Sequence, residues 1–267
     1  MEGGRAHYVR AGSGPPLLLI HGIVGSAEIW RRNIPALAAQ RTVYALDLLG
    51  MGRSDRVPGL TAGLEDTARR VLATMDALGL AHADIVAASH GGAVAMMAAA
   101  LAPARVKSMV LFAPANPYST KTDWMVRLYS SAPGAVMAPF APWLPRRIHS
   151  WALNRMFGSA ARVPPDCLDI YRNTLRVPGT IPHVLAIVRC WFAEMEKLRN
   201  ALPRLASTPT LLVWGDKDRV VSLASGRRLE QELRAELVVF KGAGHLVFEE
   251  FAHESNRLMV EWLGRTR

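Results

Sequence analysis

Residues 85–94 read Ile85-Val86-Ala87-Ala88-Ser89-His90-Gly91-Gly92-Ala93-Val94. Apolar residues run into a turn of small residues, and an alanine-rich pattern follows, so the stretch predicts a strand, a tight turn and a helix. Ser89 falls at the corner, in a variant of G-x-S-x-G in which Ala87 replaces the first glycine; that motif projects a serine hydroxyl above a sheet. An ordinary serine in a tight turn is the alternative, and the rest of the chain has to decide between them.

The segments around this corner alternate between two kinds of pattern. Continuous apolar runs, typical of strands buried on both faces of a parallel sheet, occur at 15–21, 42–46, 84–88, 106–112, 208–214 and 235–240. Helical patterns are predicted at 26–39 with Ser26 as N-cap, at 61–78 with Gly79 as stop, at 90–101, at 222–233 and up to about residue 263. This order predicts an α/β fold with a mostly parallel central sheet flanked by helices.

The alternation stops between residues 116 and 200. Prolines and helical fragments rich in Trp, Met and Arg replace the apolar runs there. We interpret this part as a helical cap inserted over the sheet. The predicted division is therefore a core of residues 1–115 and 201–267 and a cap of residues 116–200.

Composition limits the functional classes. The chain has 267 residues and is 50% hydrophobic, so it can bury a sizeable core. Its formal charge of +10 is a bias toward anionic partners or membrane surfaces, but solvated surface arginines are the favoured interpretation. Its polar N-terminus has no apolar stretch typical of a secretory signal, and the most apolar window, 85–102, is interrupted by turn residues. We expect a cytoplasmic protein without integral membrane association, while peripheral membrane contact stays open. No Lys/Arg run interleaved with aromatics indicates nucleic-acid binding, and the oligomeric state is not predicted.

Metal and cofactor sites are not expected. Cys167 and Cys190 have no metal-ligand spacing and are interpreted as thiols rather than a disulfide. The G-x-G at Gly50 and Gly52 follows a strand but lacks the third glycine and the helix of a dinucleotide-binding turn.

Four loops that leave predicted strand ends carry reactive groups. They contain His21-Gly22-Ile23, Ser89-His90, Asp216-Lys217-Asp218 and Gly244-His245. Acyl transfer by serine needs a base, a carboxylate that orients it, and N–H donors for the oxyanion. In open parallel sheets such groups gather at the carboxyl ends of the strands, and here they follow the chain order Ser, Asp, His.

With these motifs, together with Asp47 and the loop 50–55, the chain resembles the α/β-hydrolase fold superfamily in its capped serine hydrolase and esterase branch. The resemblance implies Ser89 as nucleophile, His245 as general base and acid, and Asp218 as its orienting carboxylate. Asp218 is favoured over Asp216 by the spacing G-x-x-D from Gly215.

The resemblance also assigns supporting roles. It implies an oxyanion hole of the backbone N–H groups of Ile23 and His90, with His21 and Gly22 supporting that loop. The His90 side chain is expected to line the pocket rather than act as base. Asp47 and Asp55 are expected to hold loops.

The function implied is that of a cofactor-independent hydrolase. It would cleave a carboxylic ester or a related acyl bond of a hydrophobic or aromatic small molecule through an acyl-enzyme, in the manner of esterases and lipases. Acyltransferase, thioesterase and carbon–carbon bond hydrolase are alternatives within the enzymes, and a non-catalytic binding protein is the alternative outside them. A serine at this corner argues against the dehalogenase and epoxide-hydrolase branches, which need a carboxylate there. Because Ala87 replaces the first glycine of the motif, the geometry of the turn stays in question.

Overall fold

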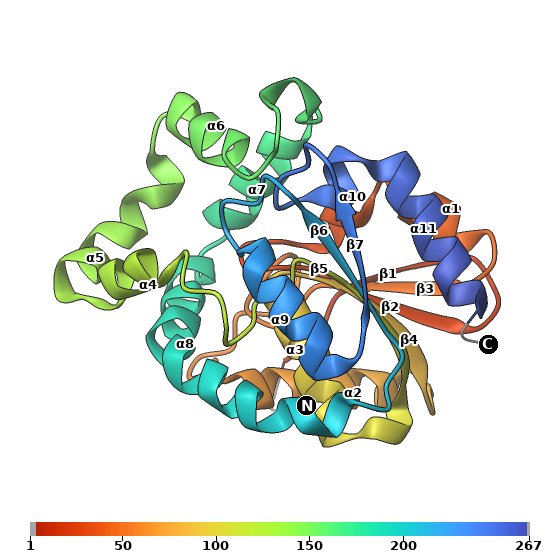
Figure 1. Ribbon diagram of the computed structural model, residues 1–267. Coiled ribbons are helices and arrows are strands. Elements are labelled where there is room, and N and C mark those ends of the chain that lie inside the picture. Colours follow the sequence, from red (N-terminus) through yellow and green to blue (C-terminus); the bar gives the residue numbers. More distant parts are fainter. Residues whose placement is uncertain (1–3, 266–267) are drawn as a thin grey trace.

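A seven-stranded sheet with strand order β1-β3-β2-β4-β5-β6-β7 forms the centre of the computed structural model, which describes residues 4–265 (Figure 1). Only β1 runs antiparallel, beside β3, and the other neighbouring strands are parallel in the described part of the chain. The strands are β1 (Tyr8–Ala11), β2 (Pro16–Ile20), β3 (Thr42–Leu46), β4 (Ala83–Ala88), β5 (Val106–Phe112), β6 (Thr210–Gly215) and β7 (Glu236–Phe240). The predicted fold class is confirmed.

Helices cover both faces of this sheet. The α-helices are α1 (Ile34–Ala38), α2 (Leu64–Ala77), α3 (His90–Leu101), α4 (Asp123–Ser130), α5 (Ala132–Met137), α6 (Arg146–Asn154), α7 (Cys167–Arg176), α8 (Thr180–Ala201), α9 (Leu223–Leu233), α10 (Val247–Glu250) and α11 (Ala252–Arg265). Short 3-10 helices are η1 (Ala27–Trp30), η2 (Pro103–Arg105), η3 (Ala138–Trp143), η4 (Ala160–Arg162) and η5 (Leu202–Leu205).

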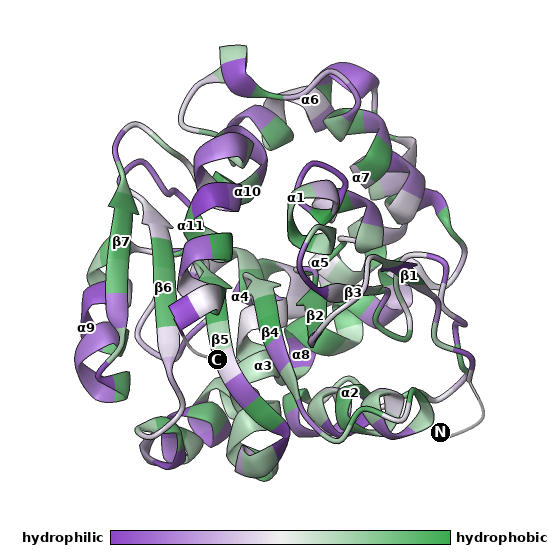
Figure 2. Cartoon of the chain, turned by 90° about the vertical axis from the view of Figure 1, so that its right-hand side faces the viewer, coloured by the Kyte–Doolittle hydropathy of each residue, from purple (hydrophilic) through white to green (hydrophobic). Residues whose placement is uncertain are grey.

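Alternate residues of each central strand enter two separate cores. Ile85 and Ala87 of β4 point into the core formed with α2, α3 and α9, whereas Val86 and Ala88 point into the core formed with α1 and α11. This follows from the two-residue period of a strand. It also explains why the strands are uniformly apolar in sequence, and Figure 2 shows the hydrophobic colouring along the central strands.

The helix after the corner is unusually buried. All residues of α3 from His90 to Ala100 are buried, because α3 packs against β4, β5, α2 and α8 at once. A helix that is apolar all round is expected in such a position, and its small alanines allow close packing. The turn before it is therefore held between packed elements.

Two parts of the prediction need correction. No strand was predicted before residue 15, but Tyr8–Ala11 forms the antiparallel edge strand β1; it is only four residues long, is largely exposed and is interrupted by Arg10, so it lacks the continuous apolar run used to find strands. The predicted helix 26–39 is instead η1 and the short α1, separated by a turn. Ser26 is extended but makes no capping hydrogen bond, and its hydroxyl is buried without a partner, so its predicted capping role is wrong.

Other boundaries hold closely. The predicted helix 61–78 is α2, and Gly79 follows it with a φ of +68°, which an L side chain rarely adopts. The Ser222 hydroxyl accepts a hydrogen bond from the Ser225 N–H and caps α9.

The segment between β5 and β6 is helical, and α4 to α8 lie within it. In Figure 1, α4, α5 and α6 form one outer edge of the molecule, and the long α8 returns the chain to the sheet. We keep the name cap for residues 116–200 and propose that it is the specificity-determining unit. Within the described residues, no helix has the length and apolar character needed to cross a bilayer.

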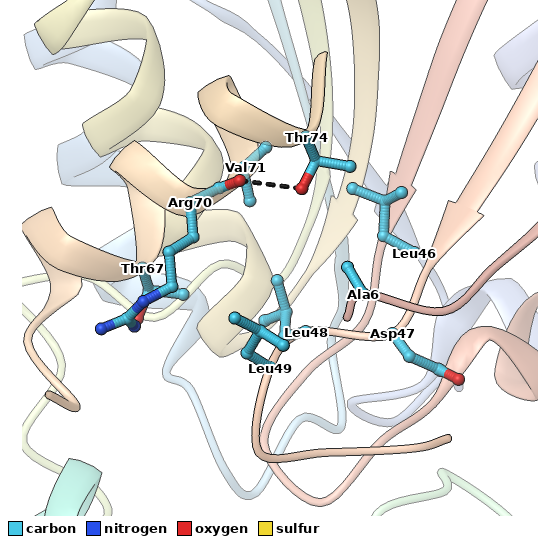
Figure 3. A pocket seen from close by; sticks show the side chains of 9 residues that line it. All are labelled: Ala6, Leu46, Asp47, Leu48, Leu49, Thr67, Arg70, Val71 and Thr74. Atoms are coloured by element: carbon cyan, nitrogen blue, oxygen red, sulfur yellow. Dashed lines mark hydrogen bonds between the residues drawn. The ribbon is translucent and has the colours of Figure 1, made fainter. Parts of the chain in front are cut away.

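A cavity of about 20 Å³ lies between α2 and the loop after β3 (Figure 3). It is lined mainly by apolar side chains, among them Leu46, Leu48, Leu49 and Val71. The Thr74 hydroxyl is not left unpaired beside it, because it donates to the Arg70 carbonyl at 2.8 Å. A space of this size holds about one water molecule, so it is a packing defect and not a substrate site.

The position of Ala87 answers the question of crowding at the corner. Ala87 is fully buried inside β4, and its methyl group packs in the core with α2 and α3. The positive φ belongs to Ser89, two residues later, and Ala87 has no left-handed backbone angle. Ala87 is thus an ordinary strand residue.

We therefore predict that Ala87→Gly destabilises the protein by about 1–2 kcal/mol, because it removes a buried methyl group and adds backbone freedom. Urea unfolding monitored by circular dichroism measures this difference. A gain in stability would instead show that the methyl group strains the turn.

Candidate active site

Ser89 occupies a strained backbone conformation at the end of β4. Its φ is +52° and its ψ is −123°, a region that non-glycine residues rarely adopt and that is enriched at functional sites. The neighbouring strand and its loop hold it there, since the Ser89 N–H donates to the Phe112 carbonyl and the Ser89 carbonyl accepts from the Ala115 N–H, both at 2.9 Å. The hydroxyl is therefore presented by a backbone fixed on both sides.

The glycines beside Ser89 are required by close approach. A Cβ atom on Gly91 would lie 2.3 Å from the His21 carbonyl oxygen, and one on Gly92 would lie 2.5 Å from the Pro114 Cβ. On the opposite side, a Cβ on Gly22 would lie 3.1 Å from the Ser89 Cβ. The loop after β2 is thus packed directly against the serine.

His245 and Asp218 form a buried pair. His245 Nδ1 lies 2.8 Å from Asp218 Oδ2, and both side chains are almost completely buried. A carboxylate only accepts, so Nδ1 is the donor in this contact, and in the neutral ring the lone pair is on the other nitrogen, Nε2. The second oxygen, Oδ1, accepts from the N–H groups of Val220 and Val221 at 2.7 and 3.0 Å, which fixes the carboxylate.

Asp216 has a different role. Its Oδ1 accepts a hydrogen bond from the Gly242 N–H at 2.7 Å and so joins the loops after β6 and β7. The structure therefore pairs His245 with Asp218, as the sequence spacing predicted. Among the described residues no hydrogen bond joins the Ser89 hydroxyl to His245, so the contact between nucleophile and base that a catalytic triad requires is not formed in this structure.

The loop of residues 21–24 is anchored by His21. Its Nε2 accepts from the Leu48 N–H at 3.1 Å, and its Nδ1 donates to the Gly22 carbonyl at 2.7 Å. Complete burial lowers the pKa of His21, so the ring is neutral and keeps this arrangement. Val24 follows with a φ of +62°, a strained value for a β-branched residue.

The two N–H groups expected to form the oxyanion hole are unoccupied. In the part of the chain that the structure describes, neither the Ile23 N–H nor the His90 N–H donates to a protein acceptor. The His90 N–H is one of the unpaired donors at the start of α3. Both groups therefore remain available to an oxyanion.

Asp47 connects the N-terminal segment to the loops after β2 and β3. Its Oδ1 accepts from the Ala27 N–H at 2.5 Å, and its Oδ2 accepts from the Arg53 N–H at 2.9 Å and lies 2.7 Å from His7 Nδ1. Asp55 accepts from the Arg5 N–H at 2.9 Å. Both acids hold loops, as expected.

Glu250 is a buried residue near the site that the sequence analysis missed. Its carboxylate accepts from the Gly244 N–H at 2.7 Å, next to His245, and from the Gly158 N–H in the cap at 2.9 Å. Arg162 of the cap donates its Nε to the same carboxylate at 2.7 Å. Glu250 thus joins the histidine loop to the cap, and no motif marks it in the sequence.

His90 lies between the corner and the cap. It is 3% exposed, its Nδ1 is buried without a hydrogen-bond partner, and its ring stacks at 6.2 Å on Trp191 of α8. Burial, assisted by the nearby His21 and His183, lowers the pKa of His90 to about 4. Its side chain is therefore neutral and only weakly basic near pH 7, and its stacking on Trp191 agrees with a lining role.

A second cavity, of about 270 Å³, lies where the cap meets the loop after β3. Its lining includes Arg56, Gly50 and the start of α8 with His183. Burial is the main cause that lowers the pKa of His183 to about 4. Across the described residues there is no cluster of three or more His, Cys, Asp or Glu side chains suited to a metal ion.

Comparison with known proteins places the chain in a family. The model of the alpha/beta hydrolase fold matches residues 15–134 and 139–252. The dihydrolipoyllysine-residue acetyltransferase component of the acetoin cleaving system of Pseudomonas putida is 33% identical over 252 residues, which are 94% of this chain; the chain spans only 64% of that relative's length.

Two further proteins resemble most of the chain. A 2-hydroxy-6-oxononadienedioate/2-hydroxy-6-oxononatrienedioate hydrolase of Paraburkholderia xenovorans is 28% identical over 270 residues, covering 96% of this chain and 90% of the relative. The solved structure of the epoxide hydrolase CorEH without ligand has a TM-score of 0.86 at 23% identity; the match covers 99% of this chain and 96% of that one and shows likeness of fold.

We predict that Glu250→Gln lowers the free energy of unfolding by about 3 kcal/mol. The buried carboxylate accepts hydrogen bonds from the N–H groups of Gly158 and Gly244 and from Arg162, whereas the glutamine amide has one accepting oxygen and an NH₂ group that only donates. Thermal unfolding measures the change. Glu254→Gln, on the exposed surface of α11, is the control and should behave as wild type. Equal stability of both variants would show that the Glu250 contacts contribute little.

A second prediction concerns acid stability. Because the folded-state pKa of His90, about 4, lies below its ordinary value of 6.5, the unfolded chain binds the proton first as the pH falls. The contribution of neutral His90 to the free energy of unfolding is fully present above pH 6.5. It decreases by about 1.4 kcal/mol per pH unit as the pH falls from 6.5 toward 4.

Urea unfolding of wild type and His90→Gln at about pH 7 and about pH 4.5 tests this. The loss of stability between the two pH values should be smaller in the variant by about 2 kcal/mol. The same replacement at the exposed His253 should leave the wild-type loss unchanged. An equal loss in the His90 variant would contradict the prediction.

Proposed function

The chain belongs to the α/β hydrolase fold family, and on that basis we propose that it is a serine hydrolase that cleaves acyl bonds with Ser89, His245 and Asp218. The observation that carries the proposal is the buried 2.8 Å pair of His245 and Asp218, in the same molecule as a serine with a strained backbone at a strand-to-helix corner. The strained backbone of Ser89 costs stability, and such strain is enriched at functional sites.

The proposed reaction follows from these positions. Ser89 Oγ attacks the acyl carbon while its proton passes to His245 Nε2, and the Asp218 carboxylate stabilises the imidazolium that forms. The N–H groups of Ile23 and His90 donate to the developing oxyanion. The leaving group takes the proton from His245, and a water that His245 then activates releases the acid from the acyl-enzyme.

A carboxylic ester, or a related acyl compound, of a hydrophobic or aromatic small molecule is the leading substrate class. The cap supports this class, because its side chains are largely aromatic and aliphatic and Trp191 of α8 stacks on His90 next to Ser89. A serine at the corner supports acyl chemistry over epoxide opening, for which the family needs a carboxylate at that position.

Carbon–carbon bond hydrolysis is the second candidate. It is favoured by the relative named as a 2-hydroxy-6-oxononadienedioate hydrolase, which aligns with nearly the whole chain. The same nucleophile, base and oxyanion donors serve both reactions. Acyl transfer is a further variant in which an alcohol or thiol replaces water.

We predict that a fluorophosphonate probe labels wild type and fails to label Ser89→Ala. Hydrolysis of the preferred substrate should fall about 10⁴-fold in that variant, because the covalent route is lost. Ser130→Ala, an exposed serine in the cap, is the control and should be labelled as wild type. Absence of labelling in wild type, or labelling that persists in Ser89→Ala, would reject the proposed nucleophile.

The bond that is cleaved is tested with two substrate series. One is a set of p-nitrophenyl esters of increasing acyl length, and the other is a set of 2-hydroxy-6-oxodienoates. A higher kcat/KM on the esters supports the leading candidate, and a higher value on the dienoates supports the second. Products formed with competing alcohols or thiols reveal acyl transfer.

A further inference from the structure

The outer part of the cap, residues 124–165, exposes an unusual amount of hydrophobic surface. Of the fifteen exposed large hydrophobic side chains in the described part of the chain, ten lie here. Trp124, Trp143 and Trp151 are 67%, 75% and 62% exposed. At about 200 Å² per tryptophan, these three side chains together expose about 400 Å².

The same segment is cationic. It contains five arginines and no Asp or Glu; the flanking acids are Asp123 and Asp166. The arginines are Arg127, Arg146, Arg147, Arg155 and Arg162. We call residues 124–165 the cap surface.

Several of these charges are unpaired. Arg146 and Arg162 bind Asp169 and Glu250, but Arg127, Arg147 and Arg155 form no salt bridge in the described part of the chain. Arg155 lies over the Trp151 ring at 5.2 Å, which places a free positive charge directly beside an exposed aromatic side chain.

The elements that carry the cap surface are α4, α5, η3 and α6. In Figure 1 the three α-helices form an outer edge of the molecule, away from the sheet. Exposed tryptophan beside arginine is the composition of helices that lie in the interface of a membrane, where the rings enter the headgroup layer and the cations meet anionic lipid.

We propose that the cap surface docks peripherally on a bilayer that contains anionic phospholipid. Charge complementarity selects this partner, since residues 124–165 contain no Asp or Glu and three of their arginines form no salt bridge within the described part of the chain. A second copy of the chain fits less well, because a symmetric contact would bring arginines against arginines. Single-stranded nucleic acid would leave the exposed aliphatic residues Val136, Met137, Leu144 and Ile148 without a stacking partner.

This proposal does not depend on the enzymatic function, and its test measures binding. The whole protein is sedimented with phosphatidylcholine vesicles that contain phosphatidylglycerol and with vesicles of phosphatidylcholine alone. We expect binding to the mixed vesicles that weakens at high salt, and binding to the neutral vesicles at least about tenfold weaker.

Two independent variants separate the charge from the apolar contribution. Arg147→Glu with Arg155→Glu should lower the partition coefficient on mixed vesicles about tenfold or more. Trp143→Ser with Trp151→Ser should lower it by a similar factor, because the rings no longer enter the interface. All four side chains are exposed, and circular dichroism checks that both variants are folded.

Matched controls lie outside the cap surface. Arg257→Glu on α11 makes the same charge change, and Val239→Ser on β7 removes another exposed hydrophobic group; both should bind as wild type. The proposal is overturned by equal binding to neutral vesicles or by an equal loss in Arg257→Glu. It is also overturned if light scattering shows a dimer that the cap variants dissociate while the wild type binds no vesicle.

Discussion

The backbone of Ser89 is the constraint on which the rest of the structure depends. A non-glycine residue with a φ of +52° costs about 1–3 kcal/mol and persists only where its surroundings determine it. Here the surroundings are β5 and the loop after it, which hydrogen-bond the N–H and the carbonyl of Ser89, and the buried helix α3. Two features of the sequence serve this constraint. The uniformly apolar strand before Ser89 supplies burial, and the glycines after it permit close packing.

A second constraint joins the cap to the core. Two adjacent buried carboxylates on α10 each bind an arginine and a different part of the chain. Glu250 binds Arg162, Gly158 and the loop of His245, while Glu249 binds Arg31, which also binds Asp166 in the cap. Breaking a buried pair leaves an uncompensated charge, so these contacts tie the position of the histidine loop to that of the cap.

Much of this arrangement was predictable from sequence because it is carried by local patterns. The parallel strands are apolar runs with strong contrast to their flanks, and the distinction between Asp218 and Asp216 followed from spacing. What failed were features set by distant partners. The strand β1 forms because β3 pairs with it, and the Ser26 hydroxyl is buried without a hydrogen-bond partner instead of capping a helix. Glu250 gains its role from contacts with Gly158, which lies 92 residues earlier in the chain. No local pattern encodes such contacts, so sequence reasoning had no signal for them.

The buried acids fall into two groups: some pair with an arginine or lysine side chain, whereas Asp47 and Asp218 accept from backbone N–H groups and a histidine. Asp84, Glu249 and Glu250 each pair with an arginine, so their charge is already compensated. Asp218 accepts from backbone N–H groups and from His245, while Lys121 donates to its main-chain carbonyl and not to its carboxylate. A carboxylate that forms no salt bridge with Lys or Arg, in a site from which water is excluded, interacts strongly with a cation that forms beside it. In the proposed reaction that cation is the imidazolium of His245, which forms when the ring takes the proton of Ser89.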